Sequence, residues 1–209
     1  MKQMFKLILT TLVFVISVVV LLATEKNNVA EKFVSPLNIG DEFVPAGYMG
    51  CGRVPENKSI DINPAFTVNP HSGSTCYKIE YVQNCPEGWA GVYWTNEADD
   101  DGANWGQYTG MDLSKKGYTK VTFWARGEKG NEAVEFGSGG VKDAKYQHKD
   151  SYKANIEGKT VILTTKWQQY TIDLTGKDLS SVIGGFFWSA NWRANPTGLI
   201  FYLDDIQFE

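Results

Sequence analysis

The chain has 209 residues, a formal net charge of −4, and seven tryptophans, ten tyrosines and eleven phenylalanines. This length suits one domain and a targeting segment, and the negative charge argues against nucleic-acid binding, which relies on basic surfaces. Aromatic side chains favour strands and also offer flat surfaces to ligands, so both a core role and a binding role must be weighed for them.

Residues 1–26 are predicted to be a targeting segment. Lys2 and Lys6 precede an apolar run at 7–22, and polar residues follow. This order is typical of a secretory signal peptide. The run would span about 24 Å as a helix, slightly less than a bilayer core of about 30 Å, so an uncleaved membrane anchor is the alternative. Both interpretations predict an exported module, either secreted or held outside the membrane by residues 7–23.

A short linker at 27–38 is expected to precede a β-rich module at 39–209. The module shows no convincing helical periodicity, and short runs of β-branched and aromatic residues alternate with clusters of Gly, Pro, Asn and Asp. The predicted strands lie at 59–63, 75–83, 89–95, 118–126, 132–137, 160–163, 167–174, 182–189 and 199–208. About nine short strands at this spacing are typical of an all-β sandwich or jelly roll.

Three cysteines, Cys51, Cys76 and Cys85, allow one disulfide and one free thiol. The sequence does not indicate which two would pair. Their spacing matches no zinc motif, and the chain has only two histidines to supplement them, so a Cys/His metal site is not expected.

An aromatic segment, Trp89-Ala90-Gly91-Val92-Tyr93-Trp94, is followed by Asn104-Trp105-Gly106. Aromatic rings stack on the apolar faces of sugars, and planar polar side chains form paired hydrogen bonds with hydroxyl groups. Residues 89–94 are interpreted as a core strand. Trp105 lies among glycine and polar residues, so Trp105 and Asn104 are candidate contacts for a carbohydrate.

Further candidate ligand contacts lie on the predicted strands and in one loop. The strand at 118–126 has an apolar face, whereas Trp124 and Arg126 share the opposite face. Arg126 and Glu135, which is on the next predicted strand, either form a buried ion pair or both face a ligand. The expected stacking residues are Trp105, Trp124, Trp188 and Trp192.

Two adjacent carboxylates, Asp204 and Asp205, interrupt the apolar, aromatic strand that ends the chain. Strand interiors disfavour Asp, and an unpaired buried charge costs several kcal/mol. A metal ion, a buried cation or a hydrogen-bond network must therefore compensate these carboxylates.

The final strand, Phe201-Tyr202-Leu203-Asp204-Asp205-Ile206-Gln207-Phe208, resembles the last strand of jelly-roll carbohydrate-binding modules with the galactose-binding-domain-like fold. The segment Trp167-Gln168-Gln169-Tyr170-Thr171-Ile172-Asp173-Leu174 is similar to the penultimate part of such modules. The resemblance covers roughly residues 40–209. It is greatest to family-eleven-like binding modules and to the domain of complex I intermediate-associated proteins.

This resemblance implies a jelly-roll sandwich that binds carbohydrate. It also implies a structural Ca²⁺ ion between the final strand and the start of the domain. Asp204 or Asp205 would then be a calcium ligand, since strand parity would direct only one of them inward, and Glu42 would be its partner.

Three functions follow from these observations. The first is non-catalytic binding of a poly- or oligosaccharide by an exported module. The second is a small glycoside hydrolase or polysaccharide lyase, although no nucleophile motif appears and no second carboxylate is placed to pair with Glu135, so no catalytic residue is assigned. The third is a structural or assembly protein that binds a protein partner.

Overall fold

Two antiparallel sheets form the framework of the described part of the chain, which comprises residues 34–53, 59–82, 86–98 and 102–209 of the computed structural model. The predicted targeting segment at 1–26, the linker up to residue 33, and Cys85 lie outside the described residues. Within the described part, no helix combines the length and apolar character needed to cross a membrane.

The six-stranded sheet, sheet I, has the strand order β3-β4-β11-β6-β9, and β1 pairs with β11. Its strands are β1 (Leu37–Asn38), β3 (Ile60–Phe66), β4 (Cys76–Tyr81), β6 (Lys120–Gly127), β9 (Gln168–Asp173) and β11 (Leu199–Phe208). The five-stranded sheet, sheet II, has the order β2-β5-β10-β7-β8. Its strands are β2 (Val44–Gly50), β5 (Trp89–Thr95), β7 (Ala133–Gly139), β8 (Lys153–Ile162) and β10 (Gly184–Asn191).

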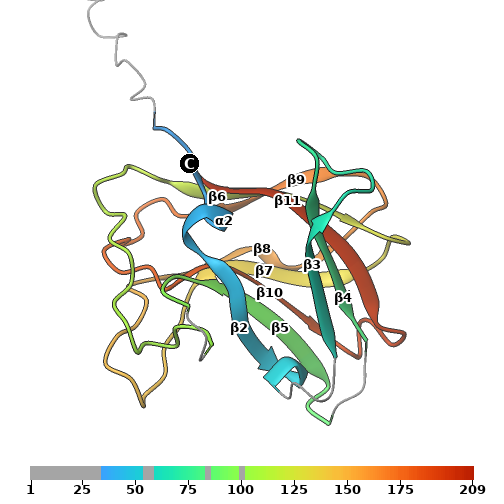
Figure 1. Ribbon diagram of the computed structural model, residues 1–209, viewed down its shortest axis with the longest axis horizontal. Coiled ribbons are helices and arrows are strands. Elements are labelled where there is room, and N and C mark those ends of the chain that lie inside the picture. The colour runs from blue at the N-terminus through green and yellow to red at the C-terminus, as the bar shows by residue number, and fades with distance from the viewer. Residues whose placement is uncertain (1–33, 54–58, 83–85, 99–101) are drawn as a thin grey trace, which may run out of the picture. The chain divides into compact units, whose positions relative to one another are not determined.

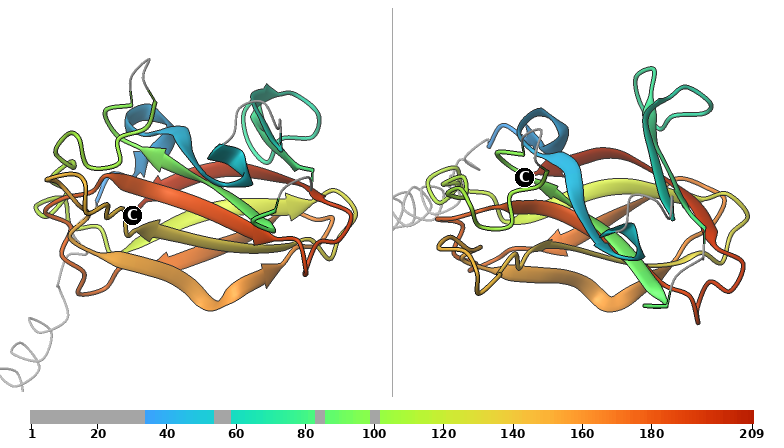
Figure 2. Two further views of the ribbon diagram at one scale, coloured as in Figure 1. Left: turned by 90° about the horizontal axis from the view of Figure 1, so that it is seen from below. Right: turned by 60° about the horizontal axis from the view of Figure 1, so that its bottom comes forward.

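The sheets form two layers, with β6, β9 and β11 above β7, β8 and β10 (Figure 1). A helical turn, α2 (Ile39–Glu42), precedes β2, and a 3₁₀ turn, η2 (Cys51–Arg53), follows it. The hairpin of β3 and β4 rises from the rest of sheet I (Figure 2, right). The all-β sandwich predicted from the sequence is therefore confirmed.

The main hydrophobic core fills the space between the two sheets. On β6, Val121, Phe123 and Ala125 are fully buried, as their alternation with polar residues predicts. Rings from both sheets meet there: the Phe123 and Phe186 centroids are 5.0 Å apart. Aromatic packing of this kind accounts for much of the unusual composition.

The predicted strands all occur, and three segments differ from expectation: β1, which lies in the predicted linker and pairs with β11, β2 and β8. β2 was not expected because its sequence contains Pro45 and two glycines, which disfavour strands. It is an edge strand with a register irregularity after Pro45, and such positions tolerate proline. β8 begins at Lys153, well before the predicted start at 160, and the left-handed residues Gly158 and Lys159 interrupt its pairing with β7.

Cys51 is disulfide-bonded, whereas Cys76 is a buried free thiol. Burial raises the pKa of the Cys76 thiol to about 11, with a further contribution from the Asp204 carboxylate. Cys76 is therefore protonated and unreactive at neutral pH.

Candidate functional site

The outer face of sheet II combines an exposed ring with polar side chains. Along β5, Ala90, Val92 and Trp94 point into the core, so Trp89, Gly91 and Tyr93 point outward. Strand β10 continues this face, because Phe187 pairs with Tyr93, Ser189 with Gly91 and Asn191 with Trp89. These residues, which come from two neighbouring strands, form the central part of the outer face.

Strands β7 and β8 extend this face and complete a hollow of about 200 Å³. Glu135 lies beside Ser189 in the register, and Thr160 lies beside Glu135. The hollow is lined by Trp89, Ala133, Glu135, Thr160, Ser189, Ala190 and Asn191. Glu135 takes part in none of the three ion pairs within the described residues, so its carboxylate is available to hydrogen-bond a ligand.

Two glycines shape the floor of this face. A Cβ atom at Gly91 would lie 2.6 Å from the Trp188 carbonyl oxygen and 3.0 Å from Ser189 Cβ. A Cβ atom at Gly137 would lie 2.4 Å from the Phe187 ring. The glycines thus allow neighbouring groups to pack closely on the sheet surface.

An aromatic wall closes one end of the face. It is a second hydrophobic cluster formed by Tyr93, Val141, Ile183 and Phe187, with Met49 and Trp105 packed against it. The Trp105 ring meets Tyr93 edge-on, with centroids 6.0 Å apart and an interplanar angle of 85°. Trp89 is 39% exposed, and its position four residues before Tyr93 places it about 13 Å from the wall along the strand.

Asp150 joins the two loops that carry this wall. Its carboxylate accepts hydrogen bonds from the backbone N–H groups of Val141, Ile183 and Gly184. Burial raises the pKa of Asp150 to about 6, although the backbone N–H donors oppose this shift. The position of the wall therefore depends on a buried carboxyl group.

Three of the predicted contact residues are buried: Trp188, Asn104 and Arg126, the last of which is 8% exposed. Trp188 has 0% exposure and packs edge-on against Phe201 in the core, so its assignment as a stacking residue is wrong. Asn104 is 1% exposed, and its amide group bonds Asn96 Oδ1 and the Tyr108 carbonyl. Asn104 therefore organises the loop that carries Trp105, and it does not offer its side chain to a ligand.

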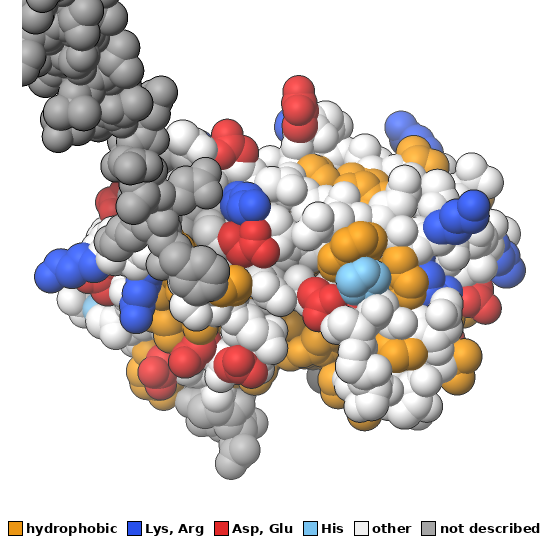
Figure 3. All heavy atoms as spheres, turned by 90° about the horizontal axis from the view of Figure 1, so that it is seen from above, with side chains coloured by type: hydrophobic (Ala, Val, Ile, Leu, Met, Phe, Trp, Pro, Cys, Tyr) orange, Lys and Arg blue, Asp and Glu red, His pale blue; other side chains and the backbone are white. Residues whose placement is uncertain are grey.

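Trp124 and Arg126 lie on the outer face of sheet I. The His71 ring stacks on Trp124 with centroids 3.7 Å apart, and the Arg126 guanidinium lies 3.6 Å from the centre of the Tyr202 ring. Figure 3 looks onto this side of the molecule, where a histidine lies among hydrophobic side chains with an acidic group beside it. One face of Trp124 is therefore already covered by the chain itself.

Arg126 and Glu135 do not act together, contrary to both alternatives drawn from the sequence. β6 belongs to sheet I and β7 to sheet II, so the two side chains point away from opposite sides of the sandwich. The structure places Trp192 close to the Trp89 end of sheet II, because its backbone N–H bonds the carbonyl of Gly88 at 2.8 Å.

Asp204 and Asp205 hold the loop between β3 and β4. Asp204 Oδ2 accepts the N–H groups of His71 and Ser72 at 2.9 and 3.1 Å. The Asp205 carboxylate accepts a hydrogen bond from the Ser72 hydroxyl at 2.7 Å and contacts His71 Nδ1 at 2.7 Å. A bulge after Asp204, with Asp205 at a φ of 47°, breaks the strand parity, so both carboxylates reach the same loop.

The predicted calcium ligands do not fit an ion in this arrangement. The fourth oxygen, Asp204 Oδ1, accepts the N–H of Asp205, so all four carboxylate oxygens have partners from the chain. Asp41, and not Glu42, lines the hollow beside these aspartates. Among the described residues, no group of three His, Cys, Asp or Glu side chains could hold a metal. We assign the two carboxylates to fixing the loop.

Sequence reasoning missed Trp89, Ser189 and Asn191 as surface residues. Strand parity carries the missing signal: Trp94 faces the core, so Trp89 must face outward. Gly91, between two outward aromatic positions, also indicates a close approach of other groups to the backbone. No local signal identifies Asp150, since its partners come from distant segments.

No protein-family model matches the sequence, and no curated protein matches it. Among solved structures, the family 11 carbohydrate-binding module of the cellulosomal cellulase Lic26A-Cel5E of Clostridium thermocellum has a TM-score of 0.52 at 12% identity, over 85% of this chain and 95% of that one. A family 30 carbohydrate-binding module has a TM-score of 0.50 at 17% identity, over 84% and 98%. The family 30 module of Cel9D-Cel44B of Clostridium thermocellum scores 0.50 at 18% identity, over 84% and 97%. The described part of the chain thus has the jelly-roll fold found in carbohydrate-binding modules, as its final strand suggested.

Proposed function

We propose that this protein binds a poly- or oligosaccharide on the outer face of sheet II, without catalysing a reaction. The observation that carries the proposal is the hollow between Trp89, Glu135 and Ser189, in which one exposed ring lies beside several hydrogen-bonding groups. Such a mixture suits sugars, which have apolar ring faces and polar edges. The shared fold with carbohydrate-binding modules supports it.

In this proposal, Trp89 stacks on one sugar ring while polar side chains bind its hydroxyl groups. Glu135 accepts hydrogen bonds, whereas Ser189 and Asn191 can both donate and accept them. The aromatic wall with Trp105 offers a second apolar contact about 13 Å away along the strand. The face would therefore contact more than one unit of a glycan chain.

A hydrolase would need more than this face provides. Glycoside hydrolysis generally uses two carboxyl groups on either side of the scissile bond. Among the described residues that line the hollow, Glu135 is the only carboxylate. Binding without bond cleavage is the function that this set of side chains supports best.

The test is retention of the purified domain on a panel of soluble and insoluble polysaccharides. We expect Trp89→Ala to weaken binding to the retained glycan by about tenfold or more, because Trp side chains often dominate binding energy. The matched control is Trp167→Ala, which removes a half-buried tryptophan from the outer face of sheet I.

Loss of retention in Trp167→Ala but not in Trp89→Ala would contradict the assignment to sheet II. No retention of the unmodified domain on any glycan would overturn carbohydrate binding and favour the protein-partner alternative. Copurification of one defined protein would then identify that partner.

We further propose that the module acts outside the cell, either secreted or anchored by residues 7–23. The disulfide at Cys51 supports this, because disulfides persist in oxidising compartments. Cell fractionation with an antibody to the folded domain checks the location.

A further inference from the structure

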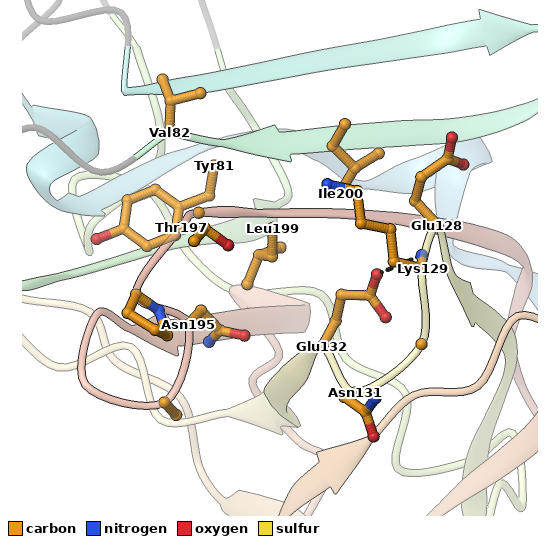
Figure 4. A pocket seen from close by; sticks show the side chains of 14 residues that line it. Tyr81, Val82, Glu128, Lys129, Asn131, Glu132, Asn195, Thr197, Leu199 and Ile200 are labelled. Atoms are coloured by element: carbon orange, nitrogen blue, oxygen red, sulfur yellow. Dashed lines mark hydrogen bonds between the residues drawn. The ribbon is translucent and has the colours of Figure 1, made fainter.

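A second cavity, of about 360 Å³, lies at one end of the sandwich. It shares no lining residue with the hollow on sheet II. Its walls are the turn between β6 and β7 at 128–132, the turn between β10 and β11 at 194–198, and the ends of β4 and β11. Figure 4 shows Glu132 on one side of this cavity and Tyr81, Thr197 and Leu199 on the other.

The Glu132 carboxylate is the unusual group in this cavity. Glu132 is only 7% exposed, and its Oε1 accepts the Lys129 N–H at 2.7 Å. Its Oε2 is buried and has no hydrogen-bond partner among the described residues. A buried carboxylate with an unpaired oxygen costs free energy, so a positive charge in the adjoining cavity would stabilise it.

The absence of a side chain at Gly127 leaves room for the Glu132 carboxylate. A Cβ atom at Gly127 would lie 1.8 Å from Glu132 Oε2, so no other residue fits at 127 without moving the side chain. The other walls of the cavity mix apolar side chains, among them Leu199 and Ile200, with polar ones such as Asn195. Because Glu132 is only 7% exposed, water solvates its carboxylate poorly.

The charges around the cavity favour a cation. Glu128 and Glu132 line it together with one lysine, Lys129, whose side chain is exposed. Neither glutamate belongs to any of the three ion pairs of the described residues. A neutral hydroxyl would leave the buried charge uncompensated, whereas an ammonium group would both compensate it and donate hydrogen bonds.

We propose that this cavity binds a primary ammonium group, with the Glu132 carboxylate as its counter-ion. Two sources offer this chemistry at a suitable size: an amino sugar, or the side chain of lysine. This proposal does not depend on carbohydrate binding at the outer face of sheet II, because the two sites use different residues.

The experiment is a titration of the ¹⁵N-labelled domain with D-glucosamine, with Nα-acetyllysine amide and, as the neutral control, with D-glucose. Saturable shifts of the Lys129 and Gly198 amide signals are expected with one or both amines and not with glucose. Shifts with glucosamine alone assign the site to an amino sugar, and shifts with the lysine derivative alone assign it to lysine. Either result supports the ammonium site.

Two variants keep the test specific. Glu132→Gln preserves the shape of the side chain and the hydrogen bond from the Lys129 N–H. This variant is expected to weaken binding of the amine at least tenfold. Thr197→Arg places a guanidinium at an exposed position of the cavity wall. This variant is expected to prevent binding of the amine without altering the core. Equal shifts with glucose, no shifts with either amine, or undiminished shifts in both variants would overturn the proposal, and retention on polysaccharides through Trp89 would be unaffected.

Discussion

Replacing Trp188 with alanine is expected to lower the free energy of unfolding by about 4 kcal/mol, the typical cost of emptying a large aromatic site in a core. Trp188 is completely buried, and its ring meets Phe201 edge-on with centroids 5.2 Å apart. The indole N–H has no hydrogen-bond partner among the described residues, so the loss arises from packing alone. Urea denaturation followed by circular dichroism measures the effect.

Two comparisons make this prediction specific. Trp188→Phe keeps most of the ring and removes the unsatisfied N–H, so it should cost clearly less than the alanine variant. Trp89→Ala should leave stability nearly unchanged while it weakens glycan retention. If Trp188→Ala instead retained full stability and lost retention, Trp188 would be a surface contact and the placement of β10 would be wrong.

Replacing Asp150 with asparagine is expected to destabilise the domain by about 3 kcal/mol, because an amide NH₂ would then face backbone N–H donors. The carboxylate accepts N–H groups from Val141, Ile183 and Gly184, which belong to the two loops behind the aromatic wall. The variant should therefore also weaken glycan retention, even though Asp150 does not reach the open face.

The same residue gives a pH dependence with a definite sign. Burial raises the pKa of Asp150 from 3.8 to about 6 in the folded protein. Folding then favours the protonated form, so this contribution to stability is fully present below about pH 4 and is lost as the pH rises to about 6. The asparagine variant cannot titrate at this position.

The measurement is the difference in unfolding free energy between the unmodified domain and Asp150→Asn at pH 4, 5 and 7. We expect this difference to be larger at pH 4 than at pH 7. The control is Asp173→Asn, at an exposed carboxylate whose pKa is lowered by hydrogen bonds from Thr175. A difference that grows with pH would show that the backbone N–H groups outweigh burial at Asp150.

Strand positions were predictable from the sequence because side-chain alternation is a local property. The two faces of β6 are those expected, with Phe123 inside and Trp124 outside. Sheet membership was not predictable, since β6 and β7 are consecutive in the chain and lie in different sheets. The expected partnership of Arg126 and Glu135 failed for this reason.

Irregular backbone limited the prediction of the candidate sites. Strand alternation predicted opposite directions for the Asp204 and Asp205 side chains, and the bulge after Asp204 abolishes that alternation. Trp188 and Trp89 show a related limit, because both lie in aromatic strands. Only their position relative to buried neighbours shows that Trp188 lies in the core and Trp89 on the surface. Composition alone gives no such distinction.

The stacking of His71 on Trp124 makes the two outer faces of the sandwich unequal. The imidazole occupies the place that a planar ligand would take on that indole, and hydrogen bonds to Asp204 and Asp205 tether it there. A tethered competitor acts at an effective concentration of order mM, which a weakly binding sugar in solution must exceed. The chain itself therefore occupies the outer ring face of Trp124 on sheet I, whereas the Trp89 ring on sheet II stays 39% exposed.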